Sequence, residues 1–352
     1  MGVTNDPIAS GHKRPIVKLG QLTRRDRSVR RIVQDWRRLT AGHAACATIV
    51  ACSGGADSAA LALALVVGKV DIQGLAHIVH DLRSPIEATA DSEAVKALAG
   101  RLKLPFFERS VRTDGSTAPP NVEAAARTVR YAALAAICRE SGAAFVATAH
   151  HANDQLETII MALVRGAGPD GLRGIAPSMA LPDGPIVIRP MLHVTREDAE
   201  RICTLAEHRW QTDQTNLDTT RLRSALRHGA LSQLLELRPD APKHATRSAE
   251  LLRDASQLIH QRAHEVFGDA MSWPRNALRD ELAVVLGAGF RAAALRLTDG
   301  LHADALTTAA IEPAIRAVRD DSTEPREFHW AARLTLGVTA NEVTLTRAES
   351  AV

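Results

Sequence analysis

The feature of this sequence that most constrains its fold is a glycine-containing turn between an apolar strand and an apolar helix. The short apolar stretch of residues 47–51 predicts a strand. Residues 59–67, which are rich in Ala and Leu, predict a helix. The turn between them, residues 53–58, reads SGGADS. A strand that passes directly into a helix in this way is typical of the βα unit of a parallel sheet.

Further strand-like stretches follow, and they alternate with helix-like stretches. Strands are predicted at residues 74–79, 106–111, 143–149 and 186–192, and helices at 87–102, 122–141, 156–165 and 195–208. This alternation predicts an α/β fold with a doubly wound parallel sheet covered on both faces. Ligands bind such sheets at the carboxyl ends of the strands, where residues 53–58, 77–83 and 150–157 are expected to lie.

Composition and charge divide the chain into four predicted parts. Residues 1–40 form a basic arm and helix, 41–212 the domain with the sheet, 213–238 a basic connector, and 239–352 a second, mainly helical domain that ends in a hairpin. The basic arm owes its charge to ten Lys and Arg within residues 13–38, against Asp26 and Asp35. Such an arm either attracts phosphate groups or is a solvated tail, and the sequence leaves both open.

Composition also excludes several classes of protein. The apolar run 59–67 is too short to span a bilayer, and the first forty residues contain no apolar core of a signal peptide, so we expect a cytoplasmic protein without a membrane partner. The four cysteines (Cys46, Cys52, Cys138 and Cys203) form no C-x-x-C pair, which argues against zinc or iron–sulfur sites and favours buried thiols. Aromatic residues are only 3% of the chain, so nucleic acid would be held mainly by charge and shape.

The turn at residues 53–58 is a candidate phosphate site. Backbone N–H groups converge where a glycine-rich turn opens a helix, and the helix dipole adds partial positive charge. The sequence contains neither G-x-x-x-x-G-K-[ST] nor G-x-G-x-x-G at this turn, which excludes the usual mononucleotide and dinucleotide loops. A tight turn that merely caps the helix is the structural alternative.

The pattern S-G-G-x-D-S resembles the signature of the PP-loop ATP pyrophosphatases, which cleave ATP between its α- and β-phosphates. The resemblance implies that ATP and Mg²⁺ are the cofactors. It places ATP at Ser53, Gly54, Gly55, Ala56, Asp57 and Ser58. Ser53, both glycines and Ser58 would cradle the pyrophosphate, and Asp57 would hold the magnesium ion as a catalytic residue.

Four further stretches are similar to the motifs of one branch of that superfamily, the tRNA(Ile)-lysidine synthetases. They are AHIVHDLR (76–83), NVEAAARTVRY (121–131), the long segment 147–175 with HHANDQLET and RGAGPDGLRG, and RPML followed by DQTNLDTTRLRSALR (213–227). Val79 and Ser224 occupy positions at which the family pattern has asparagine. The change at Val79 affects a local hydrogen bond, and the change at Ser224 affects a contact with RNA or with the backbone.

The resemblance implies a ligase that modifies tRNA. Such an enzyme would adenylate the 2-carbonyl oxygen of the wobble cytidine in the CAU anticodon of tRNA(Ile), and the ε-amine of L-lysine would then displace AMP. The product, lysidine, changes the codon read from AUG to AUA. The second domain would bind tRNA, and a homodimer is one assembly that the sequence allows.

Site residues follow from the same motifs. Asp154 and Glu157 lie three residues apart at the opening of a predicted helix, hence on one face, and the resemblance assigns both to lysine. His150 would orient the activated intermediate, whereas His151 would cap or pack. Arg130 would stabilise charge on the phosphate during adenylation. Contacts to tRNA are assigned to Arg83, Arg127, Arg223 and Arg227.

Two other functions stay open at this point. A PP-loop sulfur transferase acting on tRNA cytidine would be expected to carry paired cysteines, and a catalytically silent tRNA-binding protein would be expected to have a broken phosphate loop. The sequence contains neither feature.

Overall fold

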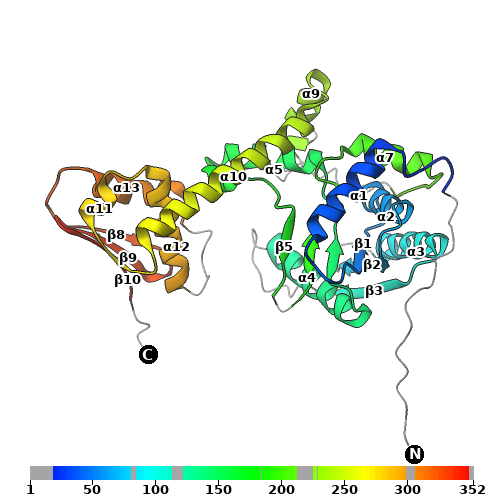
Figure 1. Ribbon diagram of the computed structural model, residues 1–352, viewed down its shortest axis with the longest axis horizontal. Helices are drawn as coiled ribbons and strands as arrows, with labels where there is room; N and C mark the ends of the chain where they lie inside the picture. The colour runs from blue at the N-terminus through cyan, green and yellow to red at the C-terminus, as the bar shows by residue number, and fades with distance from the viewer. Residues whose placement is uncertain are drawn as a thin grey trace, which may run out of the picture. The chain divides into compact units, whose positions relative to one another are not determined.

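The computed structural model describes residues 19–80, 85–112, 122–182, 184–211, 225–227, 229–298 and 306–348. The chain forms two compact units (Figure 1). One comprises Met1–Asn153 and Ala176–Thr220, and the other comprises Asp154–Ile175 and Arg221–Val352. Each unit has its own apolar core.

A six-stranded sheet forms the centre of the first unit. Its strands are β1 (Thr48–Ala51), β2 (Ile72–His80), β3 (Phe106–Val111), β4 (Phe145–Ala147), β5 (Ser178–Ala180) and β6 (Ile186–Ile188). Their order is β3-β2-β1-β4-β6-β5. All neighbours run parallel except β5, which pairs with β6 in the antiparallel sense. The predicted fold class is therefore confirmed, with an additional antiparallel strand at one edge.

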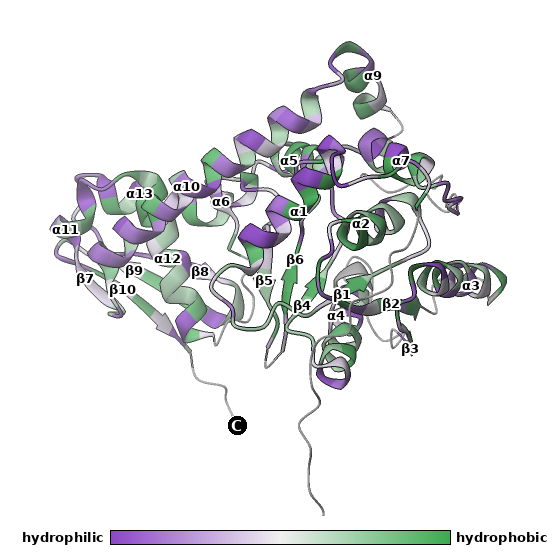
Figure 2. Ribbon diagram, turned by 45° about the vertical axis from the view of Figure 1, so that its right-hand side comes forward, coloured by the Kyte–Doolittle hydropathy of each residue, from purple (hydrophilic) through white to green (hydrophobic). Residues whose placement is uncertain are grey.

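Helices cover both faces of this sheet. On one face lie α1 (Arg27–Thr40), α2 (Ala56–Val67), α3 (Pro85–Leu102) and α7 (Arg196–Leu205), which share one core, and on the other lies α4 (Val122–Ser141). Successive strand residues point to opposite faces, so Val50 packs in the first core and Ile49 in the second. The helix α2 is buried from Ser58 to Leu65, which explains why it is apolar all round (Figure 2).

The second unit combines helices with a small antiparallel sheet. Its helices are the main part of α5 (Ala152–Val164), α6 (Pro169–Leu172), α9 (Ala230–Leu237), α10 (Ala241–Phe267), α11 (Arg275–Arg279), α12 (Ala283–Leu297) and α13 (Thr308–Arg319), with a 3₁₀ turn at Ala331–Arg333. The strands β7 (Ser272–Pro274), β8 (Arg326–Trp330), β9 (Leu334–Val338) and β10 (Glu342–Arg347) are ordered β7-β10-β9-β8. The pair β9 and β10 lies in the segment for which the sequence predicts a hairpin.

The units divide the chain differently from the predicted boundaries at residues 41, 213 and 239, which stay predictions. The division falls inside α5, after Asn153. Packing explains it: Leu156 and Ile159 of α5 belong to the same apolar cluster as Leu231 of α9 and Ala249 of α10. The segment 154–175 is therefore part of the second unit although it follows the sheet strand β4 in sequence.

The four cysteines, all described, are free thiols. Cys52, Cys138 and Cys203 are buried and Cys46 is half-buried. Burial raises the pKa of all three buried thiols, to about 12 for Cys138 and Cys203. Thiols with such pKa values are poor nucleophiles near neutral pH, so these three are packing side chains, as expected. Within the described ranges no helix has the length and apolar character needed to cross a membrane.

Candidate functional site

The phosphate-loop candidate, residues 53–58, follows β1, at which the order of the sheet reverses. The chain moves outward from β1 to β2 and β3 and then returns to the other side of β1 as β4. Loops that leave neighbouring strands in opposite directions open a crevice at the carboxyl edge of the sheet. Residues after β1 and residues 148–153 after β4 therefore border the same crevice.

Ser58 holds the loop in its shape. Its Oγ accepts a hydrogen bond from the backbone N–H of Ser53 (3.1 Å) and donates one to the carbonyl of Gly55 (3.1 Å). Ser58 is buried, whereas Ser53 is exposed. Gly55 is the N-cap of α2 and has no side chain to cap it. The first backbone N–H groups of a helix lack partners within the helix, so the loop offers these donors and the Ser53 hydroxyl to an anion.

Gly54 has a φ of +93°, in the left-handed region that favours glycine. A Cβ there would lie 3.4 Å from Oδ1 of Asp91, and the backbone would cost an L-residue about 1–2 kcal/mol. We expect Gly54→Ala to reduce ATP-dependent pyrophosphate release about ten- to a hundred-fold, because the loop donors would be displaced. Gly42→Ala is the matched control: φ is +83° and no atom lies within 4 Å. If both variants lose activity equally, the effect is general strain and not loop geometry.

Three neighbouring segments support the loop. The buried side chain of His77, on β2, contacts the carbonyl oxygen of Cys52 through Nδ1 (2.9 Å). The backbone N–H of Gln211 donates to the carbonyl of Gly54 (3.3 Å), and Sγ of Cys203 in α7 donates to the carbonyl of Ala56 (3.4 Å). These three carbonyls at the loop therefore have partners in the surrounding protein, which hold the loop backbone in place.

Two adjacent histidines follow β4 and differ in role. His150 is half-buried, and its Nδ1 is 3.0 Å from Oγ1 of Thr148, which fixes the orientation of the ring. His151 is buried, and its Nε2 is 3.4 Å from Oδ2 of Asp57 in the first turn of α2. This contact of His151 with Asp57 was not predicted from the sequence. The doubled histidine at the strand next to β1 is the signal that could have indicated it.

Asp57 fits the magnesium ion that the sequence analysis assigns to it. Mg²⁺ prefers oxygen ligands and is usually held by one or two carboxylates together with substrate phosphates. Asp57 supplies one carboxylate beside the loop, and His151 limits how that carboxylate can turn. No cluster of three or more His, Cys, Asp or Glu suited to a metal occurs among the described residues, so the phosphates would supply the remaining ligands.

The arginines of α4 lie around one tyrosine. The guanidinium carbons of Arg127 and Arg130 are 5.3 and 5.6 Å from the centre of the Tyr131 ring. Arg127 is exposed and Arg130 half-buried. Because α4 connects the carboxyl end of β3 to the amino end of β4, its first turns are at the carboxyl edge of the sheet, as is the phosphate loop.

In the second unit the structure pairs two predicted site residues with each other. Oε1 and Oε2 of Glu157 accept hydrogen bonds from Nε (2.7 Å) and Nη2 (2.8 Å) of Arg227. Glu157 is buried, while Asp154, in the first turn of α5, is only half-buried. From the sequence, Glu157 is expected to bind lysine and Arg227 to bind tRNA, and the ion pair between them is not predicted. The other two arginines assigned to tRNA, Arg83 and Arg223, lie outside the described residues, as does Ser224.

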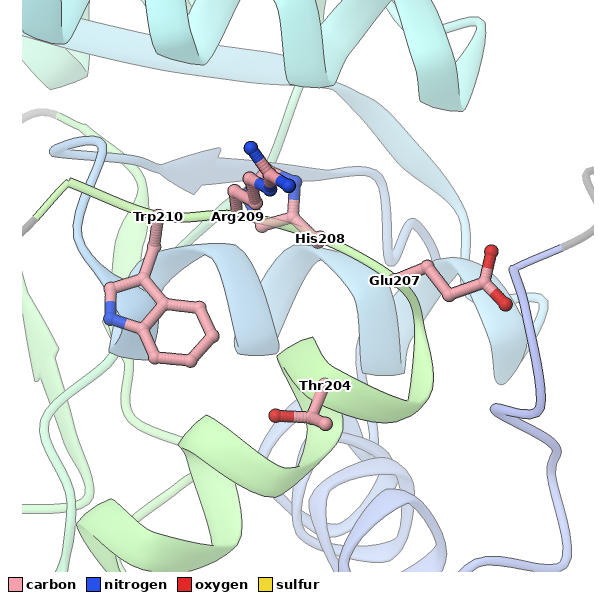
Figure 3. A pocket seen from close by; sticks show the side chains of 5 residues that line it. All are labelled: Thr204, Glu207, His208, Arg209 and Trp210. Atoms are coloured by element: carbon pink, nitrogen blue, oxygen red, sulfur yellow. The ribbon is translucent and has the colours of Figure 1, made fainter.

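A separate open cavity lies on the first unit beyond the C-terminal end of α7. It measures about 710 Å³ and is lined by Thr204, Glu207, His208, Arg209 and Trp210 (Figure 3). The side chains of Glu207 and Trp210 point away from one another, and none of the predicted site residues is among the lining ones. Since this cavity contains no residue of the predicted motifs, the crevice at the phosphate loop is the better candidate.

Comparisons with known proteins identify the family of the chain. The model of the PP-loop domain family matches residues 23–234. The chain is 34% identical to the tRNA(Ile)-lysidine synthase of Synechococcus sp., over 67% of the chain and 71% of that protein. It is 32% identical to the enzyme of that name from Nostoc sp. (64% and 65%) and 37% identical to the one from Ralstonia nicotianae (73% and 58%). The matches thus cover between 58% and 71% of these relatives' own lengths.

Proposed function

The chain belongs to the tRNA(Ile)-lysidine synthase family of PP-loop proteins, and from that premise we propose how its residues make lysidine. The proposed reaction joins L-lysine to the 2-position of the wobble cytidine in the CAU anticodon of tRNA(Ile). ATP first adenylates the cytidine, with release of pyrophosphate, and lysine then displaces AMP. The observation that carries the proposal is the glycine loop at the switch point of the sheet, with Asp57 and His151 in contact beside it.

Adenylation is assigned to the first unit. The 2-carbonyl oxygen of cytidine attacks the α-phosphorus of ATP, and the bond between this phosphorus and the β-phosphate oxygen breaks. Ser53 and the N–H groups at the start of α2 bind the departing pyrophosphate. When bound, the magnesium ion neutralises phosphate charge, and Asp57 holds it with the orientation that His151 enforces. Arg130 stabilises the additional negative charge on the α-phosphate.

Lysine transfer needs an uncharged amine. A lysine ammonium must lose a proton, which we assign to the carboxylate of Asp154 as acceptor, before the amine attacks C2 of the adenylated cytidine. The C–N bond then forms, and the bond between C2 and the AMP oxygen breaks. We assign the positioning of this amine to Asp154 and Glu157. Glu157 also accepts two hydrogen bonds from Arg227, so we assign to it the positioning of the amine together with that guanidinium, and to Asp154 a second contact with the amine. His150, oriented by Thr148, is assigned to the intermediate.

Binding of tRNA is assigned to arginines and to the second unit. Arg83, Arg127, Arg223 and Arg227 are proposed to contact tRNA phosphates or the activated nucleotide. The residues 239–352 are proposed as the tRNA-binding region. The sulfur-transferase alternative is disfavoured because three of the four thiols are buried with raised pKa values.

The adenylated intermediate can be trapped by omitting lysine. We expect the protein to transfer label from ATP that carries it at the α-phosphate to tRNA(Ile) with a CAU anticodon, and later addition of lysine to release the label as AMP. Chromatography of the tRNA and of the free nucleotides measures both steps. If the label appears on free lysine instead, the amino acid and not the cytidine is activated, and the proposal is wrong.

A further inference from the structure

Tyr131 is the single tyrosine of the chain, and positively charged side chains surround it. It is 7% exposed, within α4, and packs in the apolar layer that contains Val146 of β4 and Val187 of β6. The charged groups that face its ring come from two segments: Arg127 and Arg130 from α4 itself, and Arg189 from the residues after β6. The other members of this layer are apolar apart from the thiol of Cys138.

Arg189 is a buried cation that contacts the phenol oxygen. It is 2% exposed, donates from Nη2 to the Tyr131 hydroxyl (3.2 Å) and from Nη1 to the carbonyl of Ala176 (2.7 Å). In the described part of the chain no carboxylate forms an ion pair with Arg189, and its buried Nε has no hydrogen-bond partner. Burial of a guanidinium without a carboxylate is costly, and a less polar residue would fill the same space at lower cost. A role beyond packing is therefore indicated.

Arg127 and Arg130 are the other two cations near the ring. Both guanidinium carbons lie within the ~6 Å at which a cation is attracted to an aromatic face. Burial alone would raise the pKa of Tyr131, but the positive charges of Arg189, Arg127 and Arg130 and the hydrogen bond from Arg189 outweigh it and lower the pKa. Three cations around one ring make a local positive potential at the carboxyl edge of the sheet.

We propose that Tyr131 and Arg189 are positioning residues. Arg189 holds the Tyr131 ring in place, and the ring in turn holds the guanidinium groups of Arg127 and Arg130. These two guanidinium groups form a preorganised site for a phosphate-bearing anion. The inference rests on the proposed function in one respect, that Arg130 acts on phosphate during adenylation. It adds the means by which two flexible side chains keep a fixed geometry before the nucleotide or tRNA arrives. Fixed donors lose less on binding than mobile ones.

Because the chain has one tyrosine, tyrosinate absorbance in the ultraviolet reports Tyr131 alone. An anion at Arg127 and Arg130 cancels part of their charge, so inorganic pyrophosphate is expected to raise the pKa of Tyr131 relative to sodium chloride of equal ionic strength. Arg127→Gln and Arg130→Gln are each expected to raise it without ligand, and the double variant to abolish the response to pyrophosphate. Arg139→Gln, at the exposed C-terminal end of α4, is the matched control that should leave the titration unchanged.

Activity separates positioning from packing. Tyr131→Leu is expected to lower the adenylation rate about ten-fold, whereas Tyr131→Phe, which keeps the ring but loses the hydrogen bond from Arg189, is expected to have a rate between those of Tyr131→Leu and the wild type. A titration that responds neither to pyrophosphate nor to the two glutamine substitutions would overturn the inference. The titration needs no catalysis, so failure of the wild-type protein to adenylate tRNA would contradict the proposed function and leave this test intact.

Discussion

Replacing Asp57 by alanine is expected to abolish tRNA-dependent pyrophosphate release, with a loss of at least about a hundred-fold, while tRNA binding stays within a few-fold. Asp57 is the carboxylate in the first turn of α2 beside the phosphate loop, and it contacts His151 (3.4 Å). Loss of a metal-binding carboxylate removes charge stabilisation worth several kcal/mol in the transition state. Initial rates of pyrophosphate release and filter binding of labelled tRNA measure the two quantities separately.

Asp71→Asn is the matched control for this variant. Asp71 is exposed and precedes β2, at the opposite edge of the sheet from the loop. Its substitution removes the same charge and should leave pyrophosphate release unchanged. If Asp57→Ala releases pyrophosphate at the wild-type rate, the assignment of Asp57 to the site is wrong. If this variant loses tRNA binding as well as pyrophosphate release, it has a folding defect.

The second large effect is expected at the two carboxylates of α5. Asp154→Asn and Glu157→Gln should raise the lysine concentration required, or block lysine transfer, while adenylation of tRNA persists. Loss of a hydrogen bond to a charged group costs about 1.5–3 kcal/mol, or about ten- to a hundred-fold in lysine requirement. Lysine titrations under single-turnover conditions, started from preformed adenylated tRNA, measure transfer without the first step.

The two variants should differ in stability. Glu157→Gln leaves Arg227, whose side chain is only 24% exposed, without the carboxylate that accepts hydrogen bonds from its Nε and Nη2. We therefore expect a lower free energy of unfolding for this variant than for Asp154→Asn. Asp254→Asn, at an exposed position of α10, serves as the control in the same unit. Normal lysine transfer by both α5 variants would refute their assignment to lysine.

Local pattern predicted most of the sheet and its helices. The limits of β3 and α4 coincide with the predicted ranges 106–111 and 122–141. The strand β5 was not predicted. It has only three residues and exists through its pairing with β6, so its own sequence carries little strand signal.

The candidate site was predictable as a set of motifs but not as a set of contacts. The loop at 53–58 could be identified because glycine at a positive φ and a helix start leave a local signature. The contact of His151 with Asp57 and the pair of Glu157 with Arg227 join residues far apart in the sequence. Only tertiary structure brings them together, and neither spacing nor charge pattern indicates which carboxylate meets which cation.

Incorporation of labelled lysine into tRNA tests the central claim most directly. The wild-type protein should transfer lysine to tRNA(Ile) with a CAU anticodon only when ATP and magnesium are present, and nuclease digestion should locate the label at the wobble nucleoside. Replacing that cytidine by uridine in the same tRNA should stop the transfer. If lysine never enters the tRNA while sulfur does, or if the uridine-bearing tRNA accepts lysine equally well, the proposed reaction is wrong.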